Sequence, residues 1–318
     1  MKIVNLPTLK DIQIAHERIK PYIHQTPVLS SQQLNEKSGS RLYFKCENFQ
    51  KAGAFKSRGA MNAILSLSED EINKGVATHS SGNHAQALAR AAKIMKVPAY
   101  IVMPSTAPKV KVAAVEQYGG KITFCQPTLE ARESTLNAII EKTGATLIHP
   151  YNDYYIIAGQ ATACLELISK CPDLDMILCP VGGGGLLSGT LLSTRYLSPE
   201  IKVIACEPEG ANDTWQSVKS GKLIPSLSPQ TIADGLLTSL GSLTWPIIKE
   251  QVHDVILVND QQIIEAMKLV WERMKIIIEP SSAVPVAVAL SAREELKGKK
   301  IGIILSGGNI DLNKIPWL

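Results

Sequence analysis

The sequence predicts an α/β fold in which mostly parallel, doubly wound sheets form two lobes. Three observations lead to this prediction. The chain has 318 residues, a length that suits about two domains. Its hydrophobic fraction of 45% and charged fraction of 19% are typical of a folded protein with buried cores. After residue 40, short β-rich runs alternate with helical patterns, which is the order of repeated βαβ units.

This alternation places each element in turn. Runs rich in β-branched and other apolar residues predict strands at 42–47, 75–80, 99–104 and 122–125. Apolar residues at helical spacing predict helices at 55–67, 83–96, 109–119 and 130–144. The second half continues with strands at 146–151, 176–181, 202–207, 254–258, 269–274 and 301–308 and with helices at 156–170 and 185–197.

Two polar segments predict the domain boundaries. They are SEDEINKG near residue 70 and PYNDYY near residue 152. We therefore expect a small lobe, residues 69–152, inserted into a large lobe of residues 1–68 and 153–318. Ligands of such sheets bind beyond the carboxyl ends of the strands, so functional residues are expected there.

Charge and composition exclude several classes of partner. The net charge of +4 comes from scattered lysines and arginines, and the aromatic fraction of 5% is too sparse to stack nucleic-acid bases. The first 20 residues carry charges every few positions, which argues against a secretory signal or membrane span and favours a cytoplasmic location. Six cysteines without a C-x-x-C pair are expected to be reduced thiols. The histidines His16, His24, His149 and His253 lack metal-ligand spacing and are interpreted as structural.

Lys56 lies in GAFKSRGA, where a helical pattern begins. The positive end of a helix disfavours an ammonium group there and lowers its pKa. A partly neutral amine can condense with an aldehyde. The alternative is an ordinary surface lysine.

A run of four glycines follows an apolar strand and opens a helix. Gly182, Gly183, Gly184 and Gly185 allow several backbone N–H groups to converge on one anion, as in a phosphate cup. The run lacks the Lys-Ser/Thr of a P-loop and the spaced glycines of a dinucleotide site. A tight turn without a ligand is the alternative.

Two further polar loops follow predicted strands. Ser80, Ser81 and Asn83 offer hydroxyls and an amide at a helix start, where a carboxylate could dock, although a simple N-cap is the alternative. Ser306 places a neutral hydroxyl at another strand end, and its alternative is a plain turn. A phosphate cup, a reactive lysine, a carboxylate loop and this hydroxyl together fit pyridoxal 5′-phosphate with an amino-acid substrate.

The chain resembles the serine racemase and serine/threonine dehydratase family of fold-type II pyridoxal-phosphate enzymes. The resemblance extends from TPVLSS through ENFQKAGAFKSRGA, HSSGNHAQA, PVGGGGLLSG, TIADG and WERMK to LSGGN. It implies cofactor contacts from Phe55, Lys56, Asn83, Gly182, Gly183, Gly184, Gly185 and Ser306. It also implies that Lys56 joins the cofactor aldehyde and Ser81 is the second base, and that Ser80 and Arg132 handle the substrate.

The resemblance further implies a divalent cation and a nucleotide. Glu207 and Asp213 offer hard oxygen ligands after a strand, and with the carbonyl of Ala211 they match the family's Mg²⁺, Mn²⁺ or Ca²⁺ ligands. A solvated acidic loop is the alternative from the residues alone. Positions that match an ATP activator site are Ser31, Gln32, Lys51, Gln86, Tyr118, Lys275 and Asn309. Gln32 and Ala52 replace hydroxyl residues of the family, and Tyr151 replaces an asparagine near the cofactor.

These observations predict a cytoplasmic, homodimeric serine racemase that also dehydrates L-serine and L-threonine. The neutral hydroxyl of Ser306 makes the cofactor ring a weaker electron sink than a carboxylate would, which favours elimination. One alternative is a dehydratase of threo-3-hydroxyaspartate or threonine without meaningful racemase activity. Another is a non-catalytic metabolite sensor, which would not need Lys56, Ser81 and Ser306 together.

Overall fold

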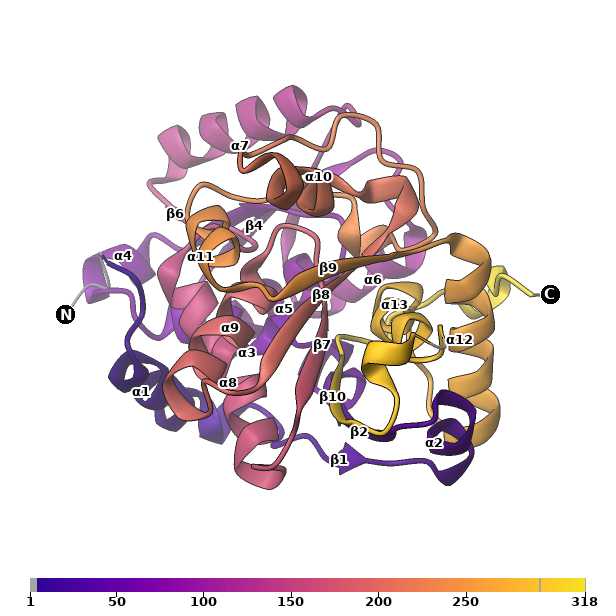
Figure 1. Cartoon of the computed structure of the whole chain (residues 1–318). Helices are drawn as coiled ribbons and strands as arrows, with labels where there is room; N and C mark the ends of the chain where they lie inside the picture. The colour runs from indigo at the N-terminus through magenta and orange to yellow at the C-terminus, as the bar shows by residue number, and fades with distance from the viewer. Residues whose placement is uncertain (1–4, 292, 318) are drawn as a thin grey trace.

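A large, mostly parallel sheet forms one half of the protein (Figure 1). The computed structural model describes residues 5–291 and 293–317. The strand order is β1-β2-β10-β7-β8-β9. β1 pairs with β2 antiparallel, and the other neighbouring pairs are parallel. The strands are β1 (Val28–Leu29), β2 (Arg41–Cys46), β7 (Met176–Pro180), β8 (Lys202–Pro208), β9 (Asp254–Val258) and β10 (Lys300–Leu305).

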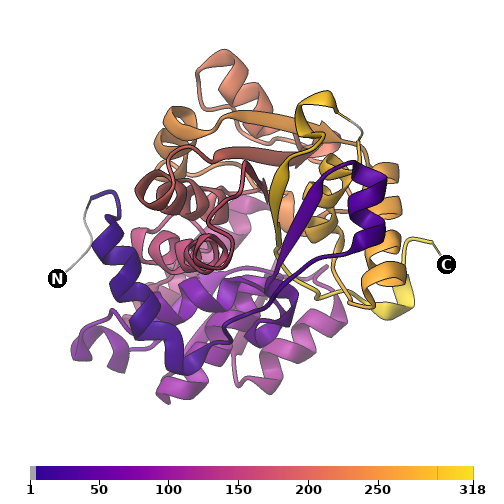
Figure 2. The same ribbon diagram turned by 60° about the horizontal axis from the view of Figure 1, so that its bottom comes forward.

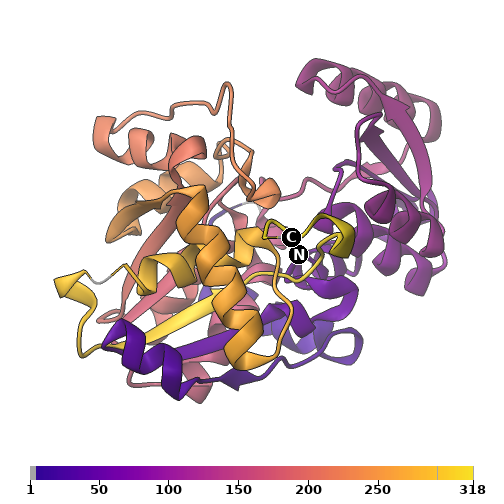
Figure 3. The same cartoon turned by 90° about the vertical axis from the view of Figure 1, so that its right-hand side faces the viewer.

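A second sheet, parallel throughout, has the order β5-β4-β3-β6. Its strands are β3 (Val76–His79), β4 (Ala99–Pro104), β5 (Lys121–Cys125) and β6 (Thr146–Leu147). With its helices it forms a lobe to one side of the large sheet (Figure 3). The two parallel sheets and their helices confirm the predicted α/β class.

Helices connect and cover both sheets. They are α1 (Leu9–Ile19), α2 (Gln32–Ser38), α3 (Lys56–Ile64), α4 (Glu69–Asn73), α5 (Asn83–Met95), α6 (Lys109–Gln117), α7 (Leu129–Thr143), α8 (Tyr154–Lys170), α9 (Gly185–Leu197), α10 (Asp213–Ser220), α11 (Thr244–Gln251), α12 (Asp260–Met274) and α13 (Pro280–Ala289). Short 3-10 turns lie at Lys20–Tyr22, Glu47–Phe49, Lys51–Gly53, Glu209–Ala211, Asp234–Leu236, Glu294–Leu296 and Leu312–Lys314. Among the described residues, every helix is too short or too polar to span a membrane.

One predicted strand is wrong. Residues 269–274 belong to α12, whose buried residues Ile263, Ala266, Met267 and Val270 recur at positions i, i+3, i+4 and i+7. That spacing is helical, so the apolar run is the end of an amphipathic helix. The strand predicted at 146–151 is also shorter in the structure, where only Thr146–Leu147 is assigned to β6.

The large sheet separates two cores. On β10, Ile301, Ile303 and Leu305 pack into one core with α12 and α13, while Ile304 packs into the other with α8 and α9. This alternation follows from the two-residue period of a strand. Figure 2 shows β2, from the N-terminal part of the chain, beside β10 from the C-terminal part.

The small sheet is built in the same way. Ile101 and Met103 of β4 face the core that contains α5, and Val102 faces the core beneath α7. Ile19 of α1 and Met61 of α3 also pack into the α5 core. Residues from both sides of the boundary predicted after residue 68 share this core. The domain boundaries after residues 68 and 152 therefore stay a prediction.

Four charged side chains are buried together between β2, α3 and α8. Arg58 Nε donates to Glu47 Oε2 at 2.7 Å, and Arg58 Nη2 donates to Glu166 Oε2 at 2.8 Å. Lys45 Nζ donates to Glu166 Oε2 at 2.5 Å. All four side chains are at most 3% exposed. Two cations and two carboxylates therefore balance one another, and this set is called the buried charge cluster below.

The buried charge cluster fixes the start of α3. This helix has no side-chain hydrogen bond at its N-cap, Phe55. Arg58 lies in its first turn and ties that turn to the 3-10 turn after β2 and to α8. Burial alone would raise the pKa of Glu47, but the Arg58 guanidinium holds it below its ordinary value.

We expect Arg58→Met to destabilise the protein by about 3–5 kcal/mol, because it leaves carboxylates buried without their partner. Urea unfolding followed by circular dichroism measures this. The matched control is Arg195→Met, which removes an ion pair to Glu250 between side chains that are 47% and 62% exposed. That change should lower the free energy of unfolding by less than about 1 kcal/mol. Equal costs for the two variants would contradict a special role for the buried charge cluster.

Candidate active site

The site begins where the chain before α3 pairs with the chain after β10. Phe55 N donates to Ser306 O at 3.0 Å, and Gly308 N donates to Gly53 O at 2.9 Å. Gly53 has a φ of +69°, and a Cβ there would lie 2.3 Å from Asn309 Oδ1. Only glycine fits this position. The pairing holds the first turn of α3 at the carboxyl end of β10, as the sequence predicts for functional loops.

Lys56 is the first residue of α3 and is partly buried. Its Nζ donates to the carbonyl of Pro150 at 2.7 Å and lies 5.1 Å from the centre of the Phe55 ring. Burial lowers the pKa of Lys56 to about 8, although the negative charge of Glu279 opposes the shift. A larger fraction of the amine is therefore neutral, and able to attack an aldehyde, than in an ordinary lysine.

The polar loop after β3 leads into the same place. Asn83 opens α5, and its Nδ2 donates to Glu279 Oε1 at 2.8 Å. Asn83 Oδ1 accepts from Asn309 Nδ2 at 2.9 Å. Ser80 and Ser81 directly follow β3, and Gly82 separates them from this helix. The structure thus brings together Lys56, Asn83 and the loop of Ser306, which the sequence reasoning selected one by one.

Glu279 belongs to this cluster and was missed by the sequence reasoning. It is 2% exposed, and burial raises its pKa to about 7. An available signal was the order of residues in IIIEP, where an acidic residue follows an apolar run and precedes a proline that starts a helix. Glu279 is the N-cap of α13, but its carboxylate points to Asn83 instead of capping the helix.

The four-glycine run forms the turn between β7 and α9. Gly184 has a φ of +87°, which favours glycine. A Cβ on Gly183 would lie 2.2 Å from the Tyr151 ring. The carbonyl of Gly183 accepts from Thr244 Oγ1 at 2.9 Å. The turn therefore has the glycines that a close approach requires, and it opens α9 as an anion-binding loop would.

The segment after β6 supplies the wall beside Lys56. His149 Nδ1 accepts from Tyr151 N at 3.3 Å and Asn152 N at 2.9 Å, so the neutral ring carries its proton on Nε2. Burial, with the nearby His79 and Lys56, lowers the pKa of His149 to about 4. His149 is thus a neutral neighbour of the predicted reactive lysine. The sequence reasoning gave it a structural role only.

Ser306 directly follows β10 and is 3% exposed. Its Oγ lies 3.1 Å from Ser282 Oγ, and Ser282 Oγ also accepts from Gly307 N at 2.7 Å. Arg132 lies on α7, and its Nε is buried without a hydrogen-bond partner among the described residues. Burial and the positive charge of Arg132 lower the pKa of His79, the last residue of β3. Arg132 therefore belongs to the side of the site formed by the small sheet.

Of the predicted cation ligands, Glu207 lies near the carboxyl end of β8, and Ala211 and Asp213 follow that strand. Glu207 accepts from the backbone N–H groups of Thr214 and Trp215, both at 2.9 Å. Burial raises the pKa of Glu207 to about 8 and that of Asp213 to about 6. Asp213 Oδ2 is buried without a hydrogen-bond partner in the described structure. Within the described ranges, no group of three or more His, Cys, Asp or Glu side chains could hold a metal ion.

The predicted nucleotide positions are spread over several elements. Asn309 contacts Asn83, Ser31 caps α2, and Lys275 ends α12 in a left-handed conformation with a φ of +59°. Ser31 and Gln32 line a cavity of ≈390 Å³ together with Arg273. The other predicted positions are Lys51, in the turn before α3, Gln86, on α5, and Tyr118, at the end of α6.

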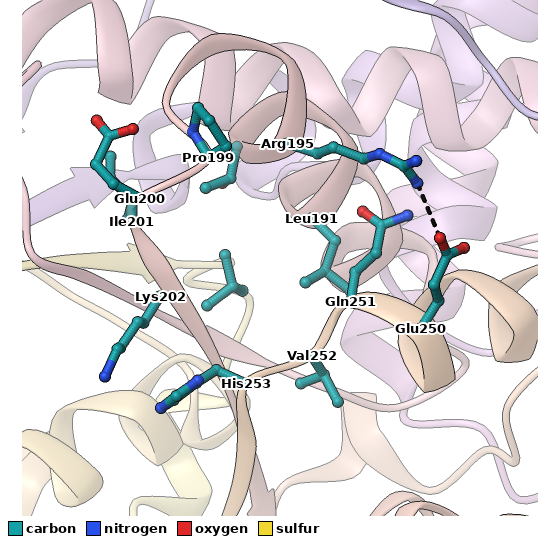
Figure 4. A pocket seen from close by; sticks show the side chains of 12 residues that line it. Leu191, Arg195, Pro199, Glu200, Ile201, Lys202, Glu250, Gln251, Val252 and His253 are labelled. Atoms are coloured by element: carbon teal, nitrogen blue, oxygen red, sulfur yellow. Dashed lines mark hydrogen bonds and ion pairs between the residues drawn. The ribbon is translucent and has the colours of Figure 1, made fainter.

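A cavity of ≈450 Å³ lies elsewhere, at the start of β8 (Figure 4). Arg195 and Glu250 form an ion pair in its wall, at 3.3 Å. The cavity also contacts Lys202, the first residue of β8, so it lies at the sheet edge opposite the glycine turn. None of the predicted site residues lines it. Ligands of open parallel sheets bind at the carboxyl edge, so we do not assign the reaction to this cavity.

Relatives of known activity cover nearly the whole chain. Serine racemase from Dictyostelium discoideum is 56% identical over 314 residues, which are 97% of this chain and 96% of that protein. The β-hydroxyaspartate dehydratase of Paracoccus denitrificans is 49% identical over 312 residues, which are 98% of this chain and 99% of that protein. The match therefore includes both lobes and all of the loops described above.

Solved structures agree with this similarity. Maize serine racemase superposes with a TM-score of 0.95 at 48% identity, covering 97% of this chain and 95% of that one. Threonine deaminase isoform 2 from Solanum lycopersicum, in its processed form, gives a TM-score of 0.89 at 32% identity, covering 99% and 95%. These neighbours confirm the predicted fold-type II architecture. The family model described as "Pyridoxal-phosphate dependent enzyme" matches residues 19–307, and the chain therefore belongs to the pyridoxal-phosphate-dependent enzymes.

Proposed function

We propose that the protein is a serine racemase that also dehydrates L-serine and L-threonine. The observation that carries this proposal is the meeting of the Lys56 amine, the Asn83 amide and the Ser306 loop at the carboxyl edge of the large sheet. The 56% identity to a serine racemase over nearly the full chain supports the choice of reaction.

The residues present fit the cofactor. Glycine at 183 and 184 lets the turn pack closely against Tyr151 and Thr244, and the backbone N–H groups at the start of α9 would hold the phosphate. Lys56 would join the aldehyde, Phe55 would lie beside the ring, and Ser306 would meet the pyridine nitrogen. When bound, pyridoxal phosphate supplies an electron-withdrawing ring conjugated to the substrate's amino group.

The chain's own residues then move the protons. The Lys56 amine takes the Cα proton on one face, and the Ser81 hydroxyl supplies a proton on the other face to give the opposite enantiomer. Ser80 and Arg132 would orient the substrate. In dehydration the β-hydroxyl leaves as water after the Cα proton is removed, and hydrolysis gives a 2-oxo acid and ammonia.

The second candidate is a dehydratase of threo-3-hydroxyaspartate or threonine with little racemase activity. The 49% identity to a β-hydroxyaspartate dehydratase favours it. Arg132, with its buried and unpartnered Nε, could bind the additional carboxylate of hydroxyaspartate. Both candidates use Lys56 in the same way and differ in the substrate and in the need for Ser81.

A divalent cation at Glu207, Asp213 and the carbonyl of Ala211 is part of the proposal. Two buried carboxylates with raised pKa values and an unpartnered oxygen on Asp213 suit a hard cation, which would supply the missing positive charge. Mg²⁺, Mn²⁺ and Ca²⁺ all fit this donor set. ATP activation, a homodimer and a cytoplasmic location remain predictions from the family resemblance and the sequence.

The Ser81→Ala variant tests the reaction. We expect it to lose at least about 100-fold in L-to-D serine conversion, because removal of a positioned acid/base group typically costs that much, while it keeps part of its L-serine dehydration. Chiral chromatography and a pyruvate assay measure the two products. Threonine and threo-3-hydroxyaspartate are assayed beside serine with the unmodified enzyme. Unchanged racemisation in the variant would exclude Ser81 as the second base, and a strong preference for hydroxyaspartate would favour the second candidate.

The pKa of Lys56 gives a pH prediction. The neutral amine attacks the aldehyde, so the rate at which the cofactor-free enzyme joins pyridoxal phosphate should rise with pH, reach half its maximum near pH 8 and level off at higher pH. Stopped-flow absorbance between pH 6 and pH 10 measures this rate. A midpoint near 10.5, the ordinary value for lysine, would contradict the effect of burial.

The cation prediction also depends on pH. Because the folded-state pKa values of Glu207 and Asp213 are raised from 4.5 and 3.8 to about 8 and about 6, these groups make the folded protein less stable as the pH rises from their ordinary pKa values to their folded-state values. Mg²⁺ binds the ionised pair, so it should raise the melting temperature more at pH 8.5 than at pH 6. At an Mg²⁺ concentration of 100 times its Kd, the free energy of unfolding should rise by about 2.7 kcal/mol. Asp213→Asn should abolish the gain, and an equal gain in that variant would place the cation elsewhere.

A further inference from the structure

Glu279 brings three parts of the chain together. Its backbone N–H donates to Gly307 O at 3.0 Å. Its carboxylate accepts from Asn83 Nδ2 at 2.8 and 3.1 Å and from the backbone N–H of Asn309 at 3.2 Å. A Cβ on Gly307 would lie 2.8 Å from Glu279 Oε1, so glycine makes room for the side chain. Glu279 is therefore built into the site rather than lying beside it.

These contacts determine which way the Asn83 amide points. An ionised carboxylate only accepts hydrogen bonds, and the backbone N–H of Asn309 also donates to Glu279, so the amide nitrogen of Asn83 faces the Glu279 carboxylate. The amide oxygen faces Asn309, whose Nδ2 donates to it at 2.9 Å and to Ala52 O at 2.8 Å. Both hydrogens of Asn309 Nδ2 are thereby used. One hydrogen of Asn83 Nδ2 is shared by the two Glu279 oxygens. The second meets no acceptor among the described residues and is therefore available to a ligand.

We propose that Glu279 is a positioning residue of the reaction: with Asn309, it fixes the Asn83 amide so that one N–H is presented to an oxygen of the bound cofactor. This inference rests on the proposed function, because it concerns the cofactor contact of Asn83. Glu279 itself acts through Asn83. The buried carboxylate prevents the amide flip that would present an oxygen, and so a repulsive contact, to the cofactor oxygen.

Charged groups on three elements influence Glu279. Lys56 comes from α3, Lys111 from α6, and Asp234 from the 3-10 turn Asp234–Leu236. Lys111 and Asp234 pair with each other. Replacing Glu279 by glutamine removes a negative charge near Lys56. It also replaces one accepting oxygen by an NH2 group, so the side chain can no longer accept from both Asn83 and Asn309. Replacing it by aspartate keeps the charge but shortens the reach to Asn83. The two variants therefore separate the effect of the hydrogen bond to Asn83 from the effect of the negative charge.

The test uses Glu279→Gln, Glu279→Asp, Asn83→Ala and the double variant Glu279→Gln/Asn83→Ala. Two readouts do not depend on turnover: the visible absorption spectrum of the bound cofactor and the Kd of pyridoxal phosphate for the cofactor-free enzyme. Both single changes at Glu279 should shift the spectrum and weaken binding about tenfold, the effect of one lost hydrogen bond to a charged group. The double variant should match Asn83→Ala, because Glu279 has nothing left to position.

Three outcomes overturn the inference. These are an unchanged spectrum and Kd in both Glu279 variants, a Glu279→Asp variant that behaves like the unmodified enzyme, or additive effects in the double variant. Circular dichroism and thermal unfolding identify any variant that is misfolded, and the aspartate variant then carries the test. If the unmodified protein shows no visible cofactor band, the proposed function fails together with the inference. If the unmodified protein shows the cofactor band and the variants have the same spectrum and Kd, only the inference fails.

Discussion

Arg58 donates hydrogen bonds to the carboxylates of Glu47 and Glu166 inside the protein, and the rest of the site depends on these contacts. A guanidinium enclosed in this way needs charged partners, since an unpaired buried charge is strongly destabilising. Two residues earlier in the same helix lies Lys56. The helix turn that the buried charge cluster holds in place is therefore the turn that carries Lys56, the amine proposed to join the cofactor. The cluster's charges are balanced among its own members, and the hydrogen bond of the amine goes to the Pro150 carbonyl.

The loops around Lys56 follow from this arrangement. Phe55 pairs with Ser306, Glu279 pairs with Gly307 and Asn83, and the carbonyl of Pro150 accepts from the lysine. Ser306, Asn83 and Pro150 follow β10, β3 and β6, because parallel strands end at one edge of a sheet. Glu279 lies between α12 and α13 and is joined to this edge through Gly307. Glycines allow the close contacts at this edge, as at Gly53 beside Asn309 and at Gly183 beside Tyr151. The site is thus a set of short, mutually supporting turns on two rigid sheets.

Most of the fold and several residues of the candidate site could be predicted from the sequence. Alternating apolar runs located the parallel strands, and the glycine run, Lys56 and the Asn83 loop stood out because unusual residues follow those strands. Glu279 was missed because its role depends on a contact with Asn83 that appears only in the folded chain. His149, interpreted as structural, hydrogen-bonds to the backbone of its own turn. Residues 269–274 were misassigned because a short apolar run fits a strand as well as the end of a helix, and only the preceding turns show the helical period.

The most direct measurement is chemical trapping of the cofactor. The protein is loaded with pyridoxal phosphate, reduced with sodium borohydride and digested, and the labelled peptide is identified by mass spectrometry. The label should lie on Lys56, in the peptide that spans the start of α3, and a Lys56→Ala protein should take up none. Labelling of a different lysine, or equal labelling of the Lys56→Ala protein, would contradict the central claim that the structure prepares this amine for the reaction.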